Sequence, residues 1–318
     1  MPPRTRSTCT ALLILLSGCF ILMAVLARGS GQPQSDRLPE TVLVLVNGEK
    51  ISEGDLQFLM LWRQLSENLR PGLRKRLMQQ LIDRRLMRAF LEKRKAPLQP
   101  RAVEAQVTYI HKIIRQAGDD PKDVLGRLGY ADEKLHAEVS LPLAWQVHAR
   151  RIITTERIRE HFYQHRQQFD GTRARASQIF LKVSSGNEAD SPQAAEKKLQ
   201  NLRDQIVGGQ LSFSEAARKY SEAPSAKQGG DVGFFPYRGK MPVAFSEAAF
   251  PLKNGEVSQP FRTRFGVHLL TVTKRRAGQL SLEDVRTQVF KVLANREWNR
   301  IVGEERKRAK IEWKTDLD

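Results

Sequence analysis

The sequence predicts an α+β protein, in which a mainly helical part is joined to a smaller part that mixes strands with helices. Between residues 40 and 170, apolar residues recur at the i, i+3, i+4 spacing that is typical of helices. Arg175–Val183 alternates between two faces, as a β-strand does, and a helical stripe follows it. Gly266–Lys274 predicts a closing strand.

The first residues predict export. Arg4 and Arg6 precede an uncharged, mostly apolar run, Thr10–Ala27, which is about long enough to cross a bilayer. Positive charge before such a run predicts that the rest of the chain lies outside the cytoplasm. Residues 1–28 fit both an uncleaved membrane anchor and a cleaved signal peptide, and the run also contains a sequence typical of lipoproteins at Cys19.

A linker and a helical domain follow. Residues 29–39 are rich in Gly, Ser, Gln and Pro, which predicts a flexible linker. Residues 40–170 open with an apolar β-rich run, Thr41–Val46, and the turn pair Asn47-Gly48. Apolar stripes then predict buried helix faces at Leu73, Leu77, Leu81, Ile82 and Leu86 and at Val103, Val107, Ile110, Ile113 and Ile114.

The C-terminal residues 279–318 predict one more helix. Its apolar residues are Val285, Val289, Val292, Leu293 and Trp298, and many of its other residues are Arg or Lys. We expect this helix to pack on the 40–170 domain, because an apolar stripe needs a partner.

The chain is strongly basic, with 53 Lys and Arg against 35 Asp and Glu, a net charge of +18. Acidic client proteins, anionic membrane surfaces and nucleic acids all suit such a charge. We expect a basic surface on one helical stretch, at Arg74, Lys75, Arg76, Arg84, Arg85, Arg88, Lys93, Arg94 and Lys95. No zinc-finger, aromatic RNA-stacking or phosphate-loop motif accompanies the charge, which argues against nucleic acid as the partner. Both cysteines, Cys9 and Cys19, precede the globular part.

The stretch Ser221–Phe235, with its three glycines, and the Phe-Gly-Val-His sequence at Phe265–His268 resemble the signature of parvulin-type (PpiC-like) peptidyl-prolyl cis-trans isomerases. The resemblance covers about residues 172–274, and we expect the corresponding domain to span residues 172–278. It implies a small antiparallel sheet with helices, and an enzyme that isomerises X-Pro bonds with no metal or cofactor.

The resemblance also implies site residues. His268, Gln178 and Thr263 match the family's catalytic positions. The positions that bind the proline ring and the adjoining part of the substrate match Val232, Phe235, Met241, Phe245 and Lys182. The family usually has His where this chain has Gln178, and Cys or Asp where it has Ala223. Lost groups at these positions predict weak activity. An alternative stays open, in which the four apolar residues only pack the core.

A second resemblance concerns the helical part. The chaperone domain of SurA-type and PrsA-type foldases is similar to this part in four stretches: Val-Asn-Gly-Glu-Lys-Ile at residues 46–51, Gln-Leu-Ile-Asp at 80–83, Leu-Gly-Tyr at 128–130 and Ile158–Phe169. Together the resemblances imply an exported foldase in the periplasm or on the outer face of the cytoplasmic membrane, acting on unfolded polypeptides that contain proline. The alternatives are a holdase chaperone without significant isomerase activity, and a basic scaffold at a membrane or nucleic acid.

Overall fold

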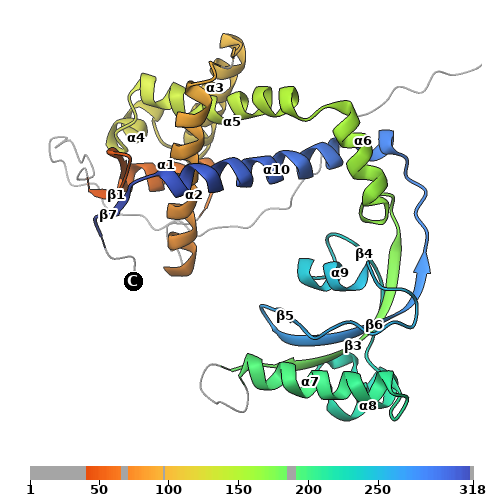
Figure 1. Cartoon of the computed structure of the whole chain (residues 1–318). Helices are drawn as coiled ribbons and strands as arrows, with labels where there is room; N and C mark the ends of the chain where they lie inside the picture. The colour runs from red at the N-terminus through yellow and green to blue at the C-terminus, as the bar shows by residue number, and fades with distance from the viewer. Residues whose placement is uncertain (1–40, 66–70, 96, 185–190, 316–318) are drawn as a thin grey trace, which may run out of the picture. The chain divides into compact units, whose positions relative to one another are not determined.

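The computed structural model describes residues 41–65, 71–95, 97–184 and 191–315. The predicted export segment and linker, together with Cys9 and Cys19, lie outside these residues. Within the described part of the chain, no helix is both long and apolar enough to cross a membrane. Helices and two small antiparallel sheets make up the structure, so the α+β prediction is confirmed (Figure 1).

The first sheet joins the two ends of the described chain. Its strands lie in the order β2-β1-β7, with bounds β1 Val42–Val46, β2 Glu49–Ser52 and β7 Ile311–Trp313. Asn47 and Gly48 have φ angles of 52° and 87° and form the predicted turn between β1 and β2. Asn47 also binds the C-terminal end, because its backbone N–H donates to the Lys310 carbonyl and its Oδ1 accepts from the Lys310 N–H.

Seven α-helices of the described residues accompany this sheet. They are α1 Glu53–Trp62, α2 Pro71–Glu92, α3 Pro100–Gln116, α4 Pro121–Arg127, α5 Asp132–Ile152, α6 Thr155–Gln164 and α10 Leu282–Arg308. Prolines begin α3 and α4, where the missing N–H costs no helical hydrogen bond. The predicted stripes of α2 and α3 are buried, except for the partly exposed Leu73 and Ile113.

The long helix α10 packs against helices from the earlier part of the chain. Its first half shares one apolar cluster with α6, and its last turns share another with α2 and α5. The buried members from α10 are Val285, Val289, Leu293, Ala294, Ile301 and Val302. Because residues 41–170 and 279–315 share cores in this way, we call them together the helical module.

Arginines of α2 are used inside the helical module. Arg84 and Arg88 both bind the carboxylate of the buried Glu138 on α5, and Arg85 pairs with Glu49. The side chains of all three arginines are largely covered. Burial alone would raise the pKa of Glu138, but the two guanidiniums outweigh it and lower that pKa. The basic surface expected along α2 is therefore wrong for these three residues, because their side chains are largely covered where they pair with Glu138 and Glu49.

The second sheet is built from one continuous stretch of chain, which we call the sheet module (residues 172–278). Its strands lie in the order β4-β3-β6-β5, with bounds β3 Arg173–Lys182, β4 Asp231–Pro236, β5 Phe261–Thr263 and β6 Gly266–Arg276. Helices α7 Pro192–Val207 and α8 Phe213–Tyr220 cover one face, and α9 Val243–Ala249 lies on the other (Figure 1).

The alternation of β3 sorts its side chains between these two faces. Ile179 and Leu181 pack under α7 and α8. Ala174 and Ala176 pack with α9 on the opposite face. Gln178 follows Ala176 by two residues, so it shares the α9 face, where the site described below is built.

Candidate functional site

His268 lies at the centre of a hydrogen-bonded chain on the α9 face of the sheet. Its Nδ1 is 3.1 Å from Gln178 Oε1, and its Nε2 is 2.8 Å from Thr263 Oγ1. The Thr263 hydroxyl oxygen also accepts the N–H of Phe265. With the amide oxygen of Gln178 as acceptor, Nδ1 carries the proton of the neutral ring and Nε2 accepts from the threonine hydroxyl. Every bond in the chain then runs in one direction, toward Gln178.

Aromatic rings enclose this imidazole. Phe261 stacks on it at 5.4 Å between centroids, Phe180 lies at 4.7 Å on a tilted plane, and Phe245 meets it edge-on at 6.0 Å. Only 6% of His268 is exposed. Burial lowers the pKa of His268 to about 4, so the ring is neutral at pH 7. The site is therefore a dry, apolar environment around an uncharged hydrogen-bonding group.

A tight hairpin between β5 and β6 brings Thr263 to His268. Gly266 begins β6 with a φ of 147°, in a region that side chains disfavour. A Cβ on Gly266 would lie 2.2 Å from the Leu181 carbonyl oxygen and 2.7 Å from the Phe180 ring. The missing side chain thus lets Phe180 lie beside the imidazole. Phe265, at the hairpin tip, is 52% exposed.

The four apolar residues predicted to hold a proline ring lie together in the cluster under α9. Phe235 and Phe245 meet edge to face at 5.5 Å and are only 0% and 1% exposed. Val232 and Met241 are partly exposed at the margin of the same cluster. Solvent therefore reaches Val232 and Met241, while Phe235 and Phe245 are covered.

Lys182 stands apart from this group, at the exposed end of β3. Its backbone N–H donates to the Glu222 carboxylate. The contact fixes the loop that leads to β4 and leaves the ammonium group in solvent.

The loop between α8 and β4 holds Gln178 in position. The Ser221 hydroxyl accepts the backbone N–H groups of Phe180 and Ala223, and the Gln178 N–H donates to the Gly230 carbonyl. Gly230 has a φ of 85°, and a Cβ there would lie 2.3 Å from the Gln178 carbonyl oxygen. Ala223 is buried and starts the short 3-10 helix of residues 224–228.

Several of these residues were not among the predicted site residues. Phe180 and Phe261 line the imidazole, and Ser221 and Gly230 hold the strand. The position of Phe180 two residues after Gln178 on the same strand face was a usable signal. Phe261 lies in register with His268 across the β5–β6 pair, which the sequence alone does not give.

Comparison with known proteins identifies the sheet module. A family model described as the rotamase, PPIC-type PPIase domain matches residues 179–274. The peptidyl-prolyl cis-trans isomerase pin1 of Rhizopus delemar is 41% identical over 110 residues, which cover 32% of this chain and 73% of that protein.

Two bacterial relatives are longer proteins. Chaperone SurA of Polaromonas sp. is 38% identical over 122 residues, or 38% of this chain, and foldase protein PrsA of Bacillus subtilis is 40% identical over 83 residues, or 26% of this chain. The alignments span 25% and 28% of those two proteins. With the family model, the pin1 alignment and the site geometry in agreement, the chain belongs to the parvulin, or PpiC-type, family of peptidyl-prolyl cis-trans isomerases, and SurA and PrsA foldases are among its relatives.

Proposed function

We propose that this protein is an exported foldase that isomerises X-Pro bonds in unfolded polypeptides and also binds them as a chaperone. The observation that supports this most directly is the neutral, ring-enclosed His268, bonded to Thr263 and Gln178 beside partly exposed apolar residues. The family membership supports the reaction, and the relatives named chaperone SurA and foldase PrsA support the role.

The proposed reaction needs rotation about an amide bond, whose barrier is about 18–20 kcal/mol in water. No bond is made or broken apart from the weakening of the C–N double-bond character. A dry site lowers the barrier because the twisted amide has a less polar carbonyl than the planar one and loses less on leaving water. In our proposal Val232 and Met241 hold the proline ring, while His268 and Thr263 keep the polar side of the site fixed and uncharged.

Gln178 limits this site in a specific way. The amide oxygen accepts the Nδ1 proton of His268, but an amide has no second tautomer to offer. A histidine at 178 could share the proton in either direction, which would let the hydrogen-bonded chain adjust as the substrate carbonyl rotates. We therefore propose weak isomerase activity.

A holdase without significant activity is the second candidate. It is favoured by the absence of the imidazole partner at Gln178, by Ala223, and by the covered state of Phe245. The same apolar residues would then bind proline-containing segments without isomerising their X-Pro bonds.

The location is part of the proposal. Positive residues before an apolar N-terminal run support export to the periplasm or to the outer face of the cytoplasmic membrane, and the SurA and PrsA relatives agree with an envelope protein. Alkaline phosphatase fused after Asp318 tests this, since the enzyme folds only after export. An inactive fusion would contradict the location.

The function is tested by the full chain and two substitutions. Gln178→His should raise the isomerisation rate of a proline peptide, measured by exchange spectroscopy, with the peptide affinity unchanged within about twofold, because only the hydrogen-bonded chain is altered. Met241→Ala should instead weaken binding of the peptide about tenfold, since it opens the wall of the ring site. Val243→Ala, at a well-exposed position two residues away, is the matched control.

Each outcome separates the two candidates. A rate rise in Gln178→His with measurable wild-type turnover supports the enzyme. Binding without turnover in both proteins supports the holdase. If neither protein binds the proline peptide, the proposed function is wrong.

A further inference from the structure

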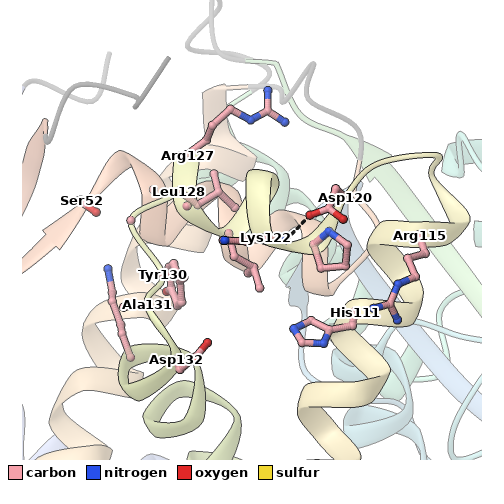
Figure 2. A pocket seen from close by; sticks show the side chains of 16 residues that line it. Ser52, His111, Arg115, Asp120, Lys122, Arg127, Leu128, Tyr130, Ala131 and Asp132 are labelled. Atoms are coloured by element: carbon pink, nitrogen blue, oxygen red, sulfur yellow. Dashed lines mark hydrogen bonds between the residues drawn. The ribbon is translucent and has the colours of Figure 1, made fainter. Parts of the chain in front are cut away.

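The helical module contains a groove that the proline site does not use. It has a volume of about 790 Å³, within the range of ligand pockets of roughly 300–1,000 Å³. The walls come from the second half of α3, from α4 and from the start of α5. Figure 2 shows His111 and Arg115 reaching from α3 on one side, with Tyr130, Ala131 and Asp132 on the other.

The cations of this groove differ from those of α2. Among the described residues, no carboxylate lies within 4.0 Å of the charged atoms of Arg115, Lys122 or Arg127, all of which line the groove and are exposed. Lys134, a fourth lining cation, pairs with the buried Asp55. Cations that the fold leaves without an internal partner are available to a ligand.

Positive charge exceeds negative charge in the lining. Its carboxylates are those of Asp120 and Asp132, against the four Lys and Arg side chains. Asp120 is already engaged, because its Oδ1 accepts the N–H of Lys122 at the start of α4. The groove therefore presents a positive field, focused by its low-dielectric walls.

The base of the groove is apolar and firmly built. Leu125 and Leu128 are buried in the cluster beneath it. Tyr130 stacks on Phe58 with centroids 4.1 Å apart, and its hydroxyl donates to Asp55 at 2.9 Å. Gly54 lies so close to the Leu128 carbonyl that a Cβ there would be 2.2 Å from its oxygen. These contacts fix the shape of the groove before any ligand arrives.

We propose that this groove binds an acidic, extended polypeptide segment, with carboxylates on Arg115 and Lys122 and apolar side chains over Leu125 and Leu128. The inference rests on the proposed role as a folding factor and deepens it by naming the class of client segment. Charge complementarity favours this occupant, since unpaired cations above an apolar base match a chain in which Asp or Glu alternates with apolar residues. The segment needs no proline, because none of the sheet module's site residues lines the groove.

The test uses the full chain and three fluorescent twelve-residue peptides without proline. In the first, Glu alternates with Leu and Phe; in the second Gln replaces Glu, and in the third Lys replaces Glu. Anisotropy should show the Glu peptide binding at least tenfold more tightly than the Gln peptide, and the Lys peptide not binding, because charge-assisted hydrogen bonds require the carboxylates.

The variant Arg115→Glu with Lys122→Glu should lose at least tenfold in affinity for the Glu peptide. The control variant Arg101→Glu with Lys112→Glu makes the same change of charge at exposed residues of α3 that do not line the groove, and should stay within twofold of the wild type. If both variants lose the same affinity for the Glu peptide, the loss comes from net charge and not from the groove, and the proposal is wrong.

Two further measurements make the outcome specific. The same variants should isomerise a proline peptide at the wild-type rate. The isomerisation assay therefore tests the proposed function, and the anisotropy measurement tests the groove separately. Vesicles containing phosphatidylglycerol provide the other arm. If the groove variant loses vesicle binding, and the wild type binds the Glu and Gln peptides equally, the ligand is an anionic membrane and the peptide proposal is wrong.

Discussion

At the scale of single residues, the site depends on a position with no side chain. Gly266 combines a φ of 147° with backbone and ring atoms where a Cβ would lie. It sets the β5–β6 hairpin and leaves the space that Phe180 fills beside His268. The imidazole environment is therefore determined as much by the glycine as by the aromatic rings.

Gly266→Ala should lower the free energy of unfolding of the sheet module by about 2–4 kcal/mol, from backbone strain and steric overlap together. The described tryptophans all lie in the helical module, so amide hydrogen exchange along β3 and β6 is the suitable measurement. Gly239→Ala is the matched control, because Gly239 also has a positive φ, of 92°, but a Cβ at that residue would meet no atom within 4 Å. Equal loss of protection in both variants would mean that the overlap at Gly266 costs nothing.

The sequence predicted part of this site. The Phe-Gly-Val-His motif and the family positions led to His268, Thr263 and Gln178, and the structure brings their side chains into one hydrogen-bonded chain. Their roles in catalysis stay predictions. The contribution of Phe261 depends on pairing across the β5–β6 hairpin, which a local pattern does not reveal. The covered state of Phe235 depends on how α9 packs, which is a property of the folded module.

At the scale of elements, α10 connects clusters that the rest of the helical module leaves incomplete. Ile301 and Val302 fill a space between α2 and α5, next to Met87 and Leu141. The ridge of α10 also carries Arg306, which binds Asp83 and the Gln79 side chain on α2. The helix is therefore an integral part of this core.

Ile301→Ala should destabilise the helical module by about 2–5 kcal/mol, the usual range for removing a large buried aliphatic side chain. Trp298 belongs to the same cluster, so its fluorescence during urea unfolding reports the change. Asn299→Ala, at an exposed position of the same helix, should change stability by less than about 0.5 kcal/mol. An unchanged unfolding midpoint for Ile301→Ala would show that α10 is dispensable for the module.

Local sequence patterns predicted where helices and strands lie better than they predicted which elements pair or pack together. The stripes of α2, α3 and α10 were readable because helical spacing repeats over several turns. The pairing of β7 with β1 was not predicted, because Ile311–Trp313 has only three residues and its partner lies near the opposite end of the described chain. The binding of Arg84 and Arg88 to Glu138 was also not predicted, because Glu138 lies 50 or more positions away in the sequence.

At the scale of the whole molecule, the fold holds two histidines, His161 and His268, neutral. Burial lowers the pKa of His268 and that of His161 to about 4, and the neighbouring His165 and two arginines add to the effect at His161. The unfolded chain has histidines with a pKa of about 6.5. Between these values the unfolded state binds more protons than the folded state, so stability falls as the pH drops from about 6.5 toward 4.

The full chain should therefore unfold at lower urea concentration at pH 5 than at pH 7. His161→Phe should reduce the proton uptake on unfolding in this window by roughly one, because one depressed group is removed. His136→Gln is a control of opposite sign: a backbone bond to Asp132 and a bond to Glu104 raise the pKa of His136, which stabilises the fold at low pH. Unfolding followed by circular dichroism at several pH values measures both. An unaltered pH dependence in His161→Phe would contradict the assignment.

The sheet module is one continuous stretch of sequence, whereas the helical module is divided into two stretches. This difference determines the order in which the modules can be completed during synthesis. The sheet module is continuous, so it has all of its strands once residue 276 has emerged. The helical module begins earlier in the chain but lacks α10 and β7 until residue 313 has emerged. Synthesis from the N-terminus thus lets the sheet module fold before the helical module is complete. Until α10 has been synthesised, Met87, Leu91 and Leu141 lack the apolar contacts that Ile301 and Val302 supply in the folded structure.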